Sequence, residues 1–169
     1  MREDLYGRQG MIMQGTLWGI ITRSPSWTDV EKFLGTKWSV LGVDKRSLAL
    51  PEIDLLDVVL IPCLGKGEHS ISGENRRARL WSSGHILLGA NTFLSLKREE
   101  GKIPESWQKY KRIYFDGSTV LESPGNVRFV LFLEFDGVTW NKGIQSLTDH
   151  SYANHVSATL PWNYRYRGS

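Results

Sequence analysis

Apolar and polar residues alternate along the last third of the chain, most regularly over 127–135. Every odd-numbered residue there is apolar, whereas the even-numbered residues include the charged Arg128 and Glu134. Because successive side chains of a strand point to opposite faces, this segment is predicted to be a strand with one fully apolar face. Val130 and Phe132 on the other face indicate a central strand that is buried on much of both sides.

Shorter β-prone segments surround this strand, and turn-forming residues separate them. Aspartate, glycine or proline at 116–117, 123–126 and 136–137 is typical of tight turns. The resulting pattern predicts an antiparallel β-meander in the C-terminal half. Its predicted strands are 111–115, 119–121, 127–135 and 138–140.

The N-terminal half mixes helical and strand patterns. A helix is predicted over 27–34, where Val30, Phe33 and Leu34 share one face. Gly35 is predicted to end that helix, because glycine readily adopts the left-handed conformation of a helix C-terminus. Strands are predicted where the sequence is apolar, at 11–21, 36–43 and 55–61.

In the segment 74–98, apolar residues recur at helical spacing. Ser82 or Ser83 is predicted to cap a helix there, and the proline at the start of 104–107 predicts a further helix. The predicted fold class is therefore α+β. An antiparallel β-meander sheet in the C-terminal half packs against two or three helices.

The 169-residue length is typical of one domain, and the sequence contains neither an internal repeat nor a linker. The domain is predicted to span 11–161, with a frayed tail at 1–10 and a tail of aromatic residues and arginines at 162–169. Because Cys63 is the only cysteine, no intrachain disulfide can form, which favours a reducing compartment. With no secretory signal pattern or membrane-length apolar segment, the protein is expected to be soluble and cytoplasmic.

Positive charge is concentrated in the middle of the chain. Residues 66–112 contain ten Lys or Arg and five Asp or Glu, although the net charge of the whole chain is only +3. Such a segment can attract a polyanion, or it can simply coat the surfaces of helices with charge. The residues predicted to bind nucleic acid are Arg76, Arg77, Arg79, Lys109, Lys111 and Arg112.

Motifs that carry catalytic or metal chemistry are incomplete. The glycines of 65–67 are not followed directly by a helix, so this segment is interpreted as a surface turn. Cys63 lies among apolar residues and is expected to be a buried thiol. His150 and His155 are five residues apart, without the tighter and repeated Cys/His spacing of recognisable zinc sites. No metal or cofactor is predicted.

No family resemblance extends along the whole chain, but two short segments resemble pieces of the barnase-type microbial ribonucleases. They are Arg98-Glu99-Glu100-Gly101-Lys102-Ile103-Pro104 and Leu147-Thr148-Asp149-His150. That family also places helices before an antiparallel sheet, and it works without metal through a carboxylate base, a phosphate-binding arginine and a histidine acid. The resemblance implies that Arg128 and His150 take the latter two roles, with Glu134 or Glu105 as the base.

Three functions remain open from the sequence. The favoured one is a non-catalytic module that binds nucleic acid or another anionic partner through the basic segment. The first alternative is a metal-independent ribonuclease-like enzyme that uses Arg128, Glu134 and His150 on a sheet face. The second is a protein-interaction or assembly component, for which an exposed apolar patch would be the evidence. Neither the ligand nor the oligomeric state follows from the sequence.

Overall fold

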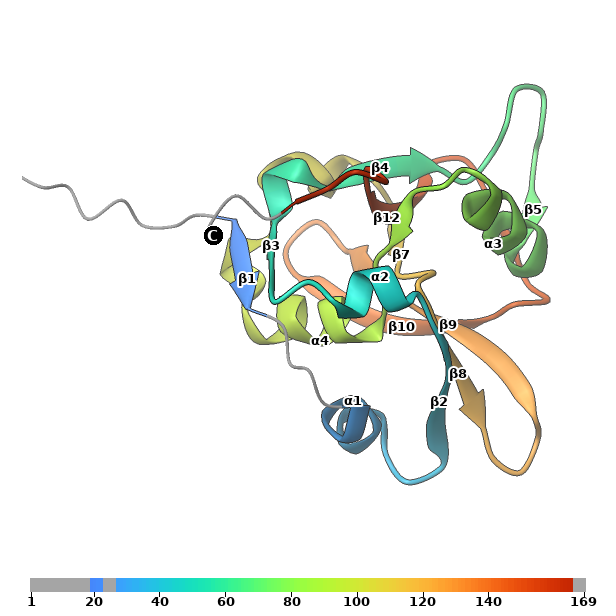
Figure 1. The fold of residues 1–169 in the computed structure, drawn as a ribbon. Helices are drawn as coiled ribbons and strands as arrows, with labels where there is room; N and C mark the ends of the chain where they lie inside the picture. The colour runs from blue at the N-terminus through green and yellow to red at the C-terminus, as the bar shows by residue number, and fades with distance from the viewer. Residues whose placement is uncertain (1–18, 23–26, 166–169) are drawn as a thin grey trace, which may run out of the picture.

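An eight-stranded, mostly antiparallel sheet organises an α+β fold (Figure 1). The structure is a computed structural model and is described for residues 19–22 and 27–165. The predicted tail at 1–10 and most of the predicted strand at 11–21 lie outside these residues. No helix among them is long and apolar enough to span a membrane.

The helical elements are α1 (Trp27–Leu34), α2 (Lys45–Leu48), α3 (Gly73–Ser82) and α4 (Ala90–Arg98), with the 3₁₀ turns η1 (Leu55–Asp57), η2 (Glu100–Lys102) and η3 (Glu105–Lys109). The strands of the first half are β1 (Ile20–Thr22), β2 (Trp38–Val43), β3 (Glu52–Asp54), β4 (Val59–Pro62), β5 (Ile71–Ser72) and β6 (Ile86–Leu87). The later strands are β7 (Arg112–Tyr114), β8 (Ser118–Glu122), β9 (Val127–Phe135), β10 (Trp140–Ser146), β11 (His150–Ser151) and β12 (His155–Leu160).

β9 is the central strand of the large sheet, as its sequence predicts. It pairs antiparallel with β10 over most of its length, with β8 through Val127–Phe129 and with β7 through Phe132–Glu134. The observed bounds of β9 equal the predicted segment 127–135. An antiparallel sheet in the C-terminal half is therefore confirmed.

β12 is the exception to the antiparallel pattern. It lies between β7, with which it runs parallel, and β4, with which it runs antiparallel. All six of its residues are buried, including the polar His155, Ser157 and Thr159. The sequence-based prediction did not include this strand.

The odd-numbered side of β9 faces the main apolar core. Leu131 and Leu133 are buried there together with Phe93 of α4. The ring of Phe93 makes edge contacts with Phe33 of α1, at a centroid distance of 6.0 Å, and with Phe115, at 5.5 Å. α1 has the predicted bounds, and it ends as predicted at Gly35, whose φ is +101°.

The even-numbered side of β9 faces a second, smaller apolar cluster. Val130 and Phe132 pack there beside Tyr114 and Cys63. The guanidinium of Arg76, on α3, lies 3.8 Å from the centroid of the Tyr114 ring. α3 therefore packs on the face of the sheet opposite to the face that carries α1 and α4.

The helical prediction over 74–98 was wrong in its middle part. Ser82 ends α3, Ser83 is its C-cap residue, and a short strand, β6, separates α3 from α4. α4 begins only after Gly89, where the Ala90 amide donates to Ser118 Oγ at 3.0 Å. A Cβ atom on Gly89 would lie 2.3 Å from that oxygen. The helix start thus depends on a distant strand residue, which local periodicity does not reveal.

Two further predictions were wrong at strand boundaries. The segment 55–61 begins with the η1 turn and becomes a strand only at Val59. The segment 138–140 is a turn up to the start of β10, which then continues to Ser146. The Asp136 side chain accepts hydrogen bonds from the Val138 and Thr139 amides, both at 2.8 Å, and these bonds hold the chain in the turn.

Candidate functional site

A polar pocket of about 470 Å³ opens on the even-numbered side of β9. Residues from β7, β10 and the β10–β11 segment surround it. Phe132 of β9 and Ile144 of β10 contribute apolar wall. The polar residues that line the pocket are Arg112, Gln145, Thr148, Asp149, His150 and Tyr152.

Arg112, at the start of β7, is fixed by three neighbours. Its Nε donates to Glu134 at 3.2 Å, its Nη1 donates to the Gln145 side-chain oxygen at 3.0 Å, and its guanidinium carbon lies 4.5 Å from the Phe132 ring centroid. The guanidinium also interacts with the Tyr114 hydroxyl. The side chain is 28% exposed. Arg112 is thus a rigid cation that is partly exposed at the pocket.

Gln145, in β10, connects the wall of the pocket to its base. Its side-chain oxygen accepts from Arg112 and, at 2.7 Å, from the Tyr114 hydroxyl. Its side-chain nitrogen donates to the backbone oxygen of His150 at 3.3 Å. Three strands, β7, β10 and β11, are therefore linked through one buried amide.

His155 lies behind the pocket and is neutral at pH 7. Burial, together with the positive charges of Arg112, Lys111 and Arg76, lowers its pKa to about 4. Its Nδ1 is 3.1 Å from the Tyr114 hydroxyl and accepts the Tyr152 amide at 3.4 Å. His155 therefore supports the segment that carries Tyr152 without adding charge to the pocket.

The rim of the pocket is held by the α3 N-terminus. The Gly73 amide donates to the Asp149 backbone oxygen at 3.0 Å, and β11 pairs with β5 through His150 and Ser72. A Cβ atom on Gly73 would lie 2.9 Å from Leu147, so a residue without a side chain is needed at this contact. Asp149 and His150 are both exposed at this rim.

The structure separates the residues of the predicted catalytic set. Arg128 pairs with Glu74 at 2.5 Å, whereas Glu134 pairs with Arg112. Arg128 and Glu134 are six residues apart on one strand, which corresponds to about 20 Å. His150 lines the polar pocket, and Arg112, which was predicted to bind nucleic acid, is the arginine that lines the same pocket. Glu105, the other carboxylate considered, lies in η3.

The predicted nucleic-acid-binding residues also occupy different environments. Arg77 donates to the Asp116 backbone oxygen at 3.1 Å, and burial lowers its pKa. Arg79 pairs with Glu68 at 2.6 Å. Lys109 and Lys111 are exposed, and Lys111 directly precedes Arg112. Of the predicted residues, only Arg112 is among the residues that line the polar pocket.

Arg76 is only 1% exposed, so it is withdrawn from any binding surface. It binds the Asp116 carboxylate through two hydrogen bonds of 3.0 and 2.9 Å, and it also donates to Ser151. The Ser157 hydroxyl donates to the same carboxylate at 2.7 Å. This Arg76–Asp116 network connects α3 to β12 and to the segment between β7 and β8.

Cys63 adjoins this network, with its Sγ 3.9 Å from Ser157 Oγ. Burial raises the pKa of its thiol to about 12. The thiol is thus protonated at neutral pH and inert as a nucleophile.

No group of three or more histidine, cysteine or acidic residues that could hold a metal ion occurs in the described part of the chain. His150 is exposed at the pocket, while His155 is buried behind it with Nδ1 facing Tyr114 and the Tyr152 amide.

Comparison with protein-family models, curated proteins and solved structures finds no match to this chain.

Sequence reasoning missed the roles of Gln145 and Tyr152. Before Gln145, the residues Asn-Lys-Gly at 141–143 interrupt the apolar pattern. The pattern therefore does not indicate that β10 continues as far as Gln145. Thr148, Asp149 and His150 belong to one of the segments that resemble the barnase-type ribonucleases, and His150 was also considered as a metal ligand with His155.

Proposed function

We propose that this protein binds single-stranded nucleic acid at the polar pocket, with one nucleotide seated against Arg112. The observation that carries the proposal is the guanidinium of Arg112, which Glu134, Gln145 and Phe132 hold at the wall of the pocket while the side chain stays 28% exposed. Arginine is the side chain best suited to phosphate, because its planar donors match the phosphate oxygens.

The fixation of Arg112 favours binding because little side-chain entropy remains to be lost. Glu134, Gln145 and Phe132 already hold the guanidinium in one orientation. Immobilising a long side chain on binding otherwise costs about 0.5–1.5 kcal/mol. The exposed Lys111 next to it adds long-range attraction for the phosphate backbone.

Two other groups at the pocket suit a base rather than a phosphate. Tyr152 is 56% exposed and can stack on a base. The Asp149 side chain has no hydrogen bond or ion pair to the described residues, and a carboxylate can accept from the amino group of cytosine or guanine. A ligand with an anionic group and donor groups, such as a nucleotide, therefore complements this pocket better than a simple anion, which Asp149 would repel.

The proposal is tested by fluorescence anisotropy with a labelled mixed-sequence RNA oligonucleotide at low salt. Arg112→Gln is expected to weaken binding at least tenfold and Tyr152→Ala about fivefold, in line with about 1–3 kcal/mol for a stacked base. Matched controls are Arg98→Gln, an exposed arginine at the end of α4, and Trp162→Ala, an exposed ring outside the pocket.

Salt dependence supplies an independent measurement. For single strands, the slope of log affinity against log salt changes by about 0.7 for each phosphate contact. Arg112→Gln should lower that slope by about this amount, whereas Tyr152→Ala should leave it unchanged. Equal affinity of the wild type and Arg112→Gln, or an equal loss in the two controls, would contradict the proposal.

A second candidate function, metal-independent RNA cleavage, is favoured by the position of Glu134 and His150 around one arginine. Glu134 is bonded to Arg112, and His150 lines the same pocket. In this reaction Glu134 would take the proton of a ribose 2′-hydroxyl, whose oxygen would attack the adjacent phosphorus. The leaving 5′-oxygen would take a proton from His150, so that a cyclic phosphate and a 5′-hydroxyl form.

Cleavage of RNA in EDTA distinguishes this reaction from binding alone. Wild type should cleave, whereas His150→Ala and Glu134→Gln should lose at least a hundredfold in rate. A matched control is His69→Ala, which changes an exposed histidine in the loop before β5. Equal background rates for all four proteins would leave binding as the only function of the pocket.

A further inference from the structure

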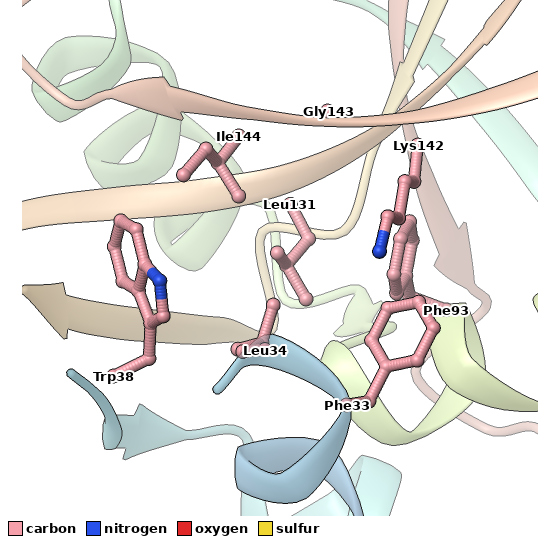
Figure 2. Close-up of a pocket in the computed structure, with 8 residues that line it drawn as sticks. All are labelled: Phe33, Leu34, Trp38, Phe93, Leu131, Lys142, Gly143 and Ile144. Atoms are coloured by element: carbon pink, nitrogen blue, oxygen red, sulfur yellow. The ribbon is translucent and has the colours of Figure 1, made fainter. Parts of the chain in front are cut away.

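A second, apolar pocket of about 180 Å³ lies on the opposite face of the sheet from the polar pocket. Figure 2 shows that α1, α4, β2, β9 and β10 all contribute side chains to it. Its floor is Leu131 of β9, on the odd-numbered side of that strand. The pocket is lined by the side chains of Phe33, Leu34, Trp38, Phe93, Leu131 and Lys142.

Lys142 is the positively charged residue that lines this apolar pocket. Lys142 of β10 places its amine 4.2 Å from the Phe33 ring centroid. No salt bridge or hydrogen bond joins that amine to any described residue. In Figure 2 the amine points into the space between the aromatic side chains rather than away from it. Lys142 is an exposed residue, so its amine stays in contact with water at the mouth of the apolar space while its aliphatic stem lines the wall.

A second donor faces Lys142 from the other wall. The indole nitrogen of Trp38 is turned toward the pocket in Figure 2, and no described residue accepts a hydrogen bond from it. The ring itself is held by an edge contact with Phe129, at a centroid distance of 5.2 Å. The Lys142 amine and the Trp38 indole nitrogen are thus both hydrogen-bond donors. The other lining side chains are hydrocarbon and contain no acceptor.

We propose that this pocket binds a small aromatic carboxylate, with the ring among Phe33, Trp38 and Leu131 and the carboxylate on Lys142. A cavity of about 150 Å³ holds a benzene molecule in a protein core, so about 180 Å³ holds one six-membered ring with a short side chain. The Lys142 amine and the Trp38 indole favour a ligand with an acidic group, because both can donate to a carboxylate, and a cationic ligand would be repelled.

The test is a titration of the ¹⁵N-labelled protein with 3-phenylpropanoate and with its neutral analogue, 3-phenylpropanamide. The acid should shift the Trp38 indole and Gly143 amide signals in a saturable way, and the amide should bind at least fivefold more weakly. Lys142→Met keeps the aliphatic stem and removes the charge, so it should abolish the preference for the acid.

Two further variants test whether the compounds bind in this pocket and whether the preference for the acid depends on Lys142 rather than on any nearby lysine. Leu34→Trp should fill the space and block both compounds, because Leu34 is a half-buried lining residue. Lys32→Met, which changes an exposed lysine on the same helix outside the pocket, should keep the fivefold preference. Absence of saturable binding, equal binding of acid and amide, or a preference that survives Lys142→Met would each overturn the proposal. None of these outcomes depends on nucleic-acid binding at the polar pocket.

Discussion

The two faces of β9 are buried by different means. On the odd-numbered face, Leu131 packs with Phe93 in a continuous apolar core. On the even-numbered face, the small cluster around Phe132 borders a network in which Arg76 and Asp116 are fully buried and bonded to each other. The odd-numbered face is buried by apolar contacts, which have no preferred direction. The even-numbered face is buried by hydrogen bonds, which have a fixed geometry.

This difference explains the kind of pocket on each face. An apolar pocket leaves no hydrogen bond unmade, because its lining loses only dispersion contacts. A polar network needs every donor and acceptor satisfied, because a buried unpaired group costs about 1–3 kcal/mol or more. The apolar face therefore carries a ring-sized cavity, whereas the polar face carries a pocket whose walls, including Arg112 and Gln145, are held by bonds.

The largest effect is expected from removing one partner of the buried ion pair. Arg76→Met leaves the Asp116 carboxylate buried with Ser157 as its remaining side-chain donor, and should lower the free energy of unfolding by about 3–5 kcal/mol. Urea denaturation measures this loss. The control Arg79→Met breaks an exposed pair with Glu68 and one hydrogen bond to the Cys63 backbone oxygen, and should cost clearly less, about 1 kcal/mol. Similar losses in both variants would mean that burial does not distinguish these pairs.

The next effect is a dependence of stability on pH through His155, which lies on the polar face. Its pKa falls from an ordinary value of 6.5 to about 4 in the folded state, so between these values the unfolded state binds more protons. Stability should therefore fall as pH decreases from 6.5 to 4, by about 3 kcal/mol in total.

Unfolding curves at several pH values test this expectation against two variants. His155→Gln removes the titrating group and should flatten the profile in this range. His150→Gln, at the exposed rim, should leave the profile close to that of the wild type. If the His155→Gln profile stayed as steep as the wild-type one, carboxylates alone would account for the acid sensitivity.

A smaller effect is expected at Gly143, which lines the apolar pocket and lies against the Phe132 ring of the polar face. A Cβ atom there would lie 2.1 Å from the Phe132 ring, which supports Arg112. Gly143→Ala should therefore cost about 1–3 kcal/mol of stability and also weaken RNA binding. Gly101→Ala is the matched control, since nothing lies within 4 Å of the added atom. Unchanged RNA affinity in Gly143→Ala would show that Arg112 does not depend on the Phe132 ring.

The smallest effect should come from an isosteric change on the apolar face. Leu131→Met keeps the volume of the side chain and should cost less than about 1.5 kcal/mol. Urea denaturation beside Arg76→Met gives the comparison directly. A loss as large as that of Arg76→Met would remove the proposed contrast between the two faces.

The parts of the fold that could be predicted are those whose signals are local. α1 has its apolar stripe and its terminating Gly35 within nine residues, and β9 has a complete alternating pattern. β12 has no such signal, because its polar residues are buried by distant partners. Ser157 bonds Asp116, and Thr159 donates to the Val59 backbone oxygen.

The candidate site shows the same limit. The sequence singled out His150 and Arg112 separately, but it placed Arg112 with the surface cations and Arg128 with the catalytic residues. Which arginine lies beside His150 depends on the pairing of β7 with β9 and of β10 with β9. The buried Arg76 was misplaced for a related reason, since Asp116 is forty positions further along the chain.

The placement of β12 has a consequence for synthesis of the protein on the ribosome. β4 and β7 can complete their pairing in the sheet only after β12 has been synthesised. β12 follows β4 by about 100 residues. At about 5–20 residues per second, the growing chain carries unpaired strand edges for several seconds. Unpaired edges are templates for aggregation, so nascent chains need protection until β12 has emerged and joined the two parts of the sheet.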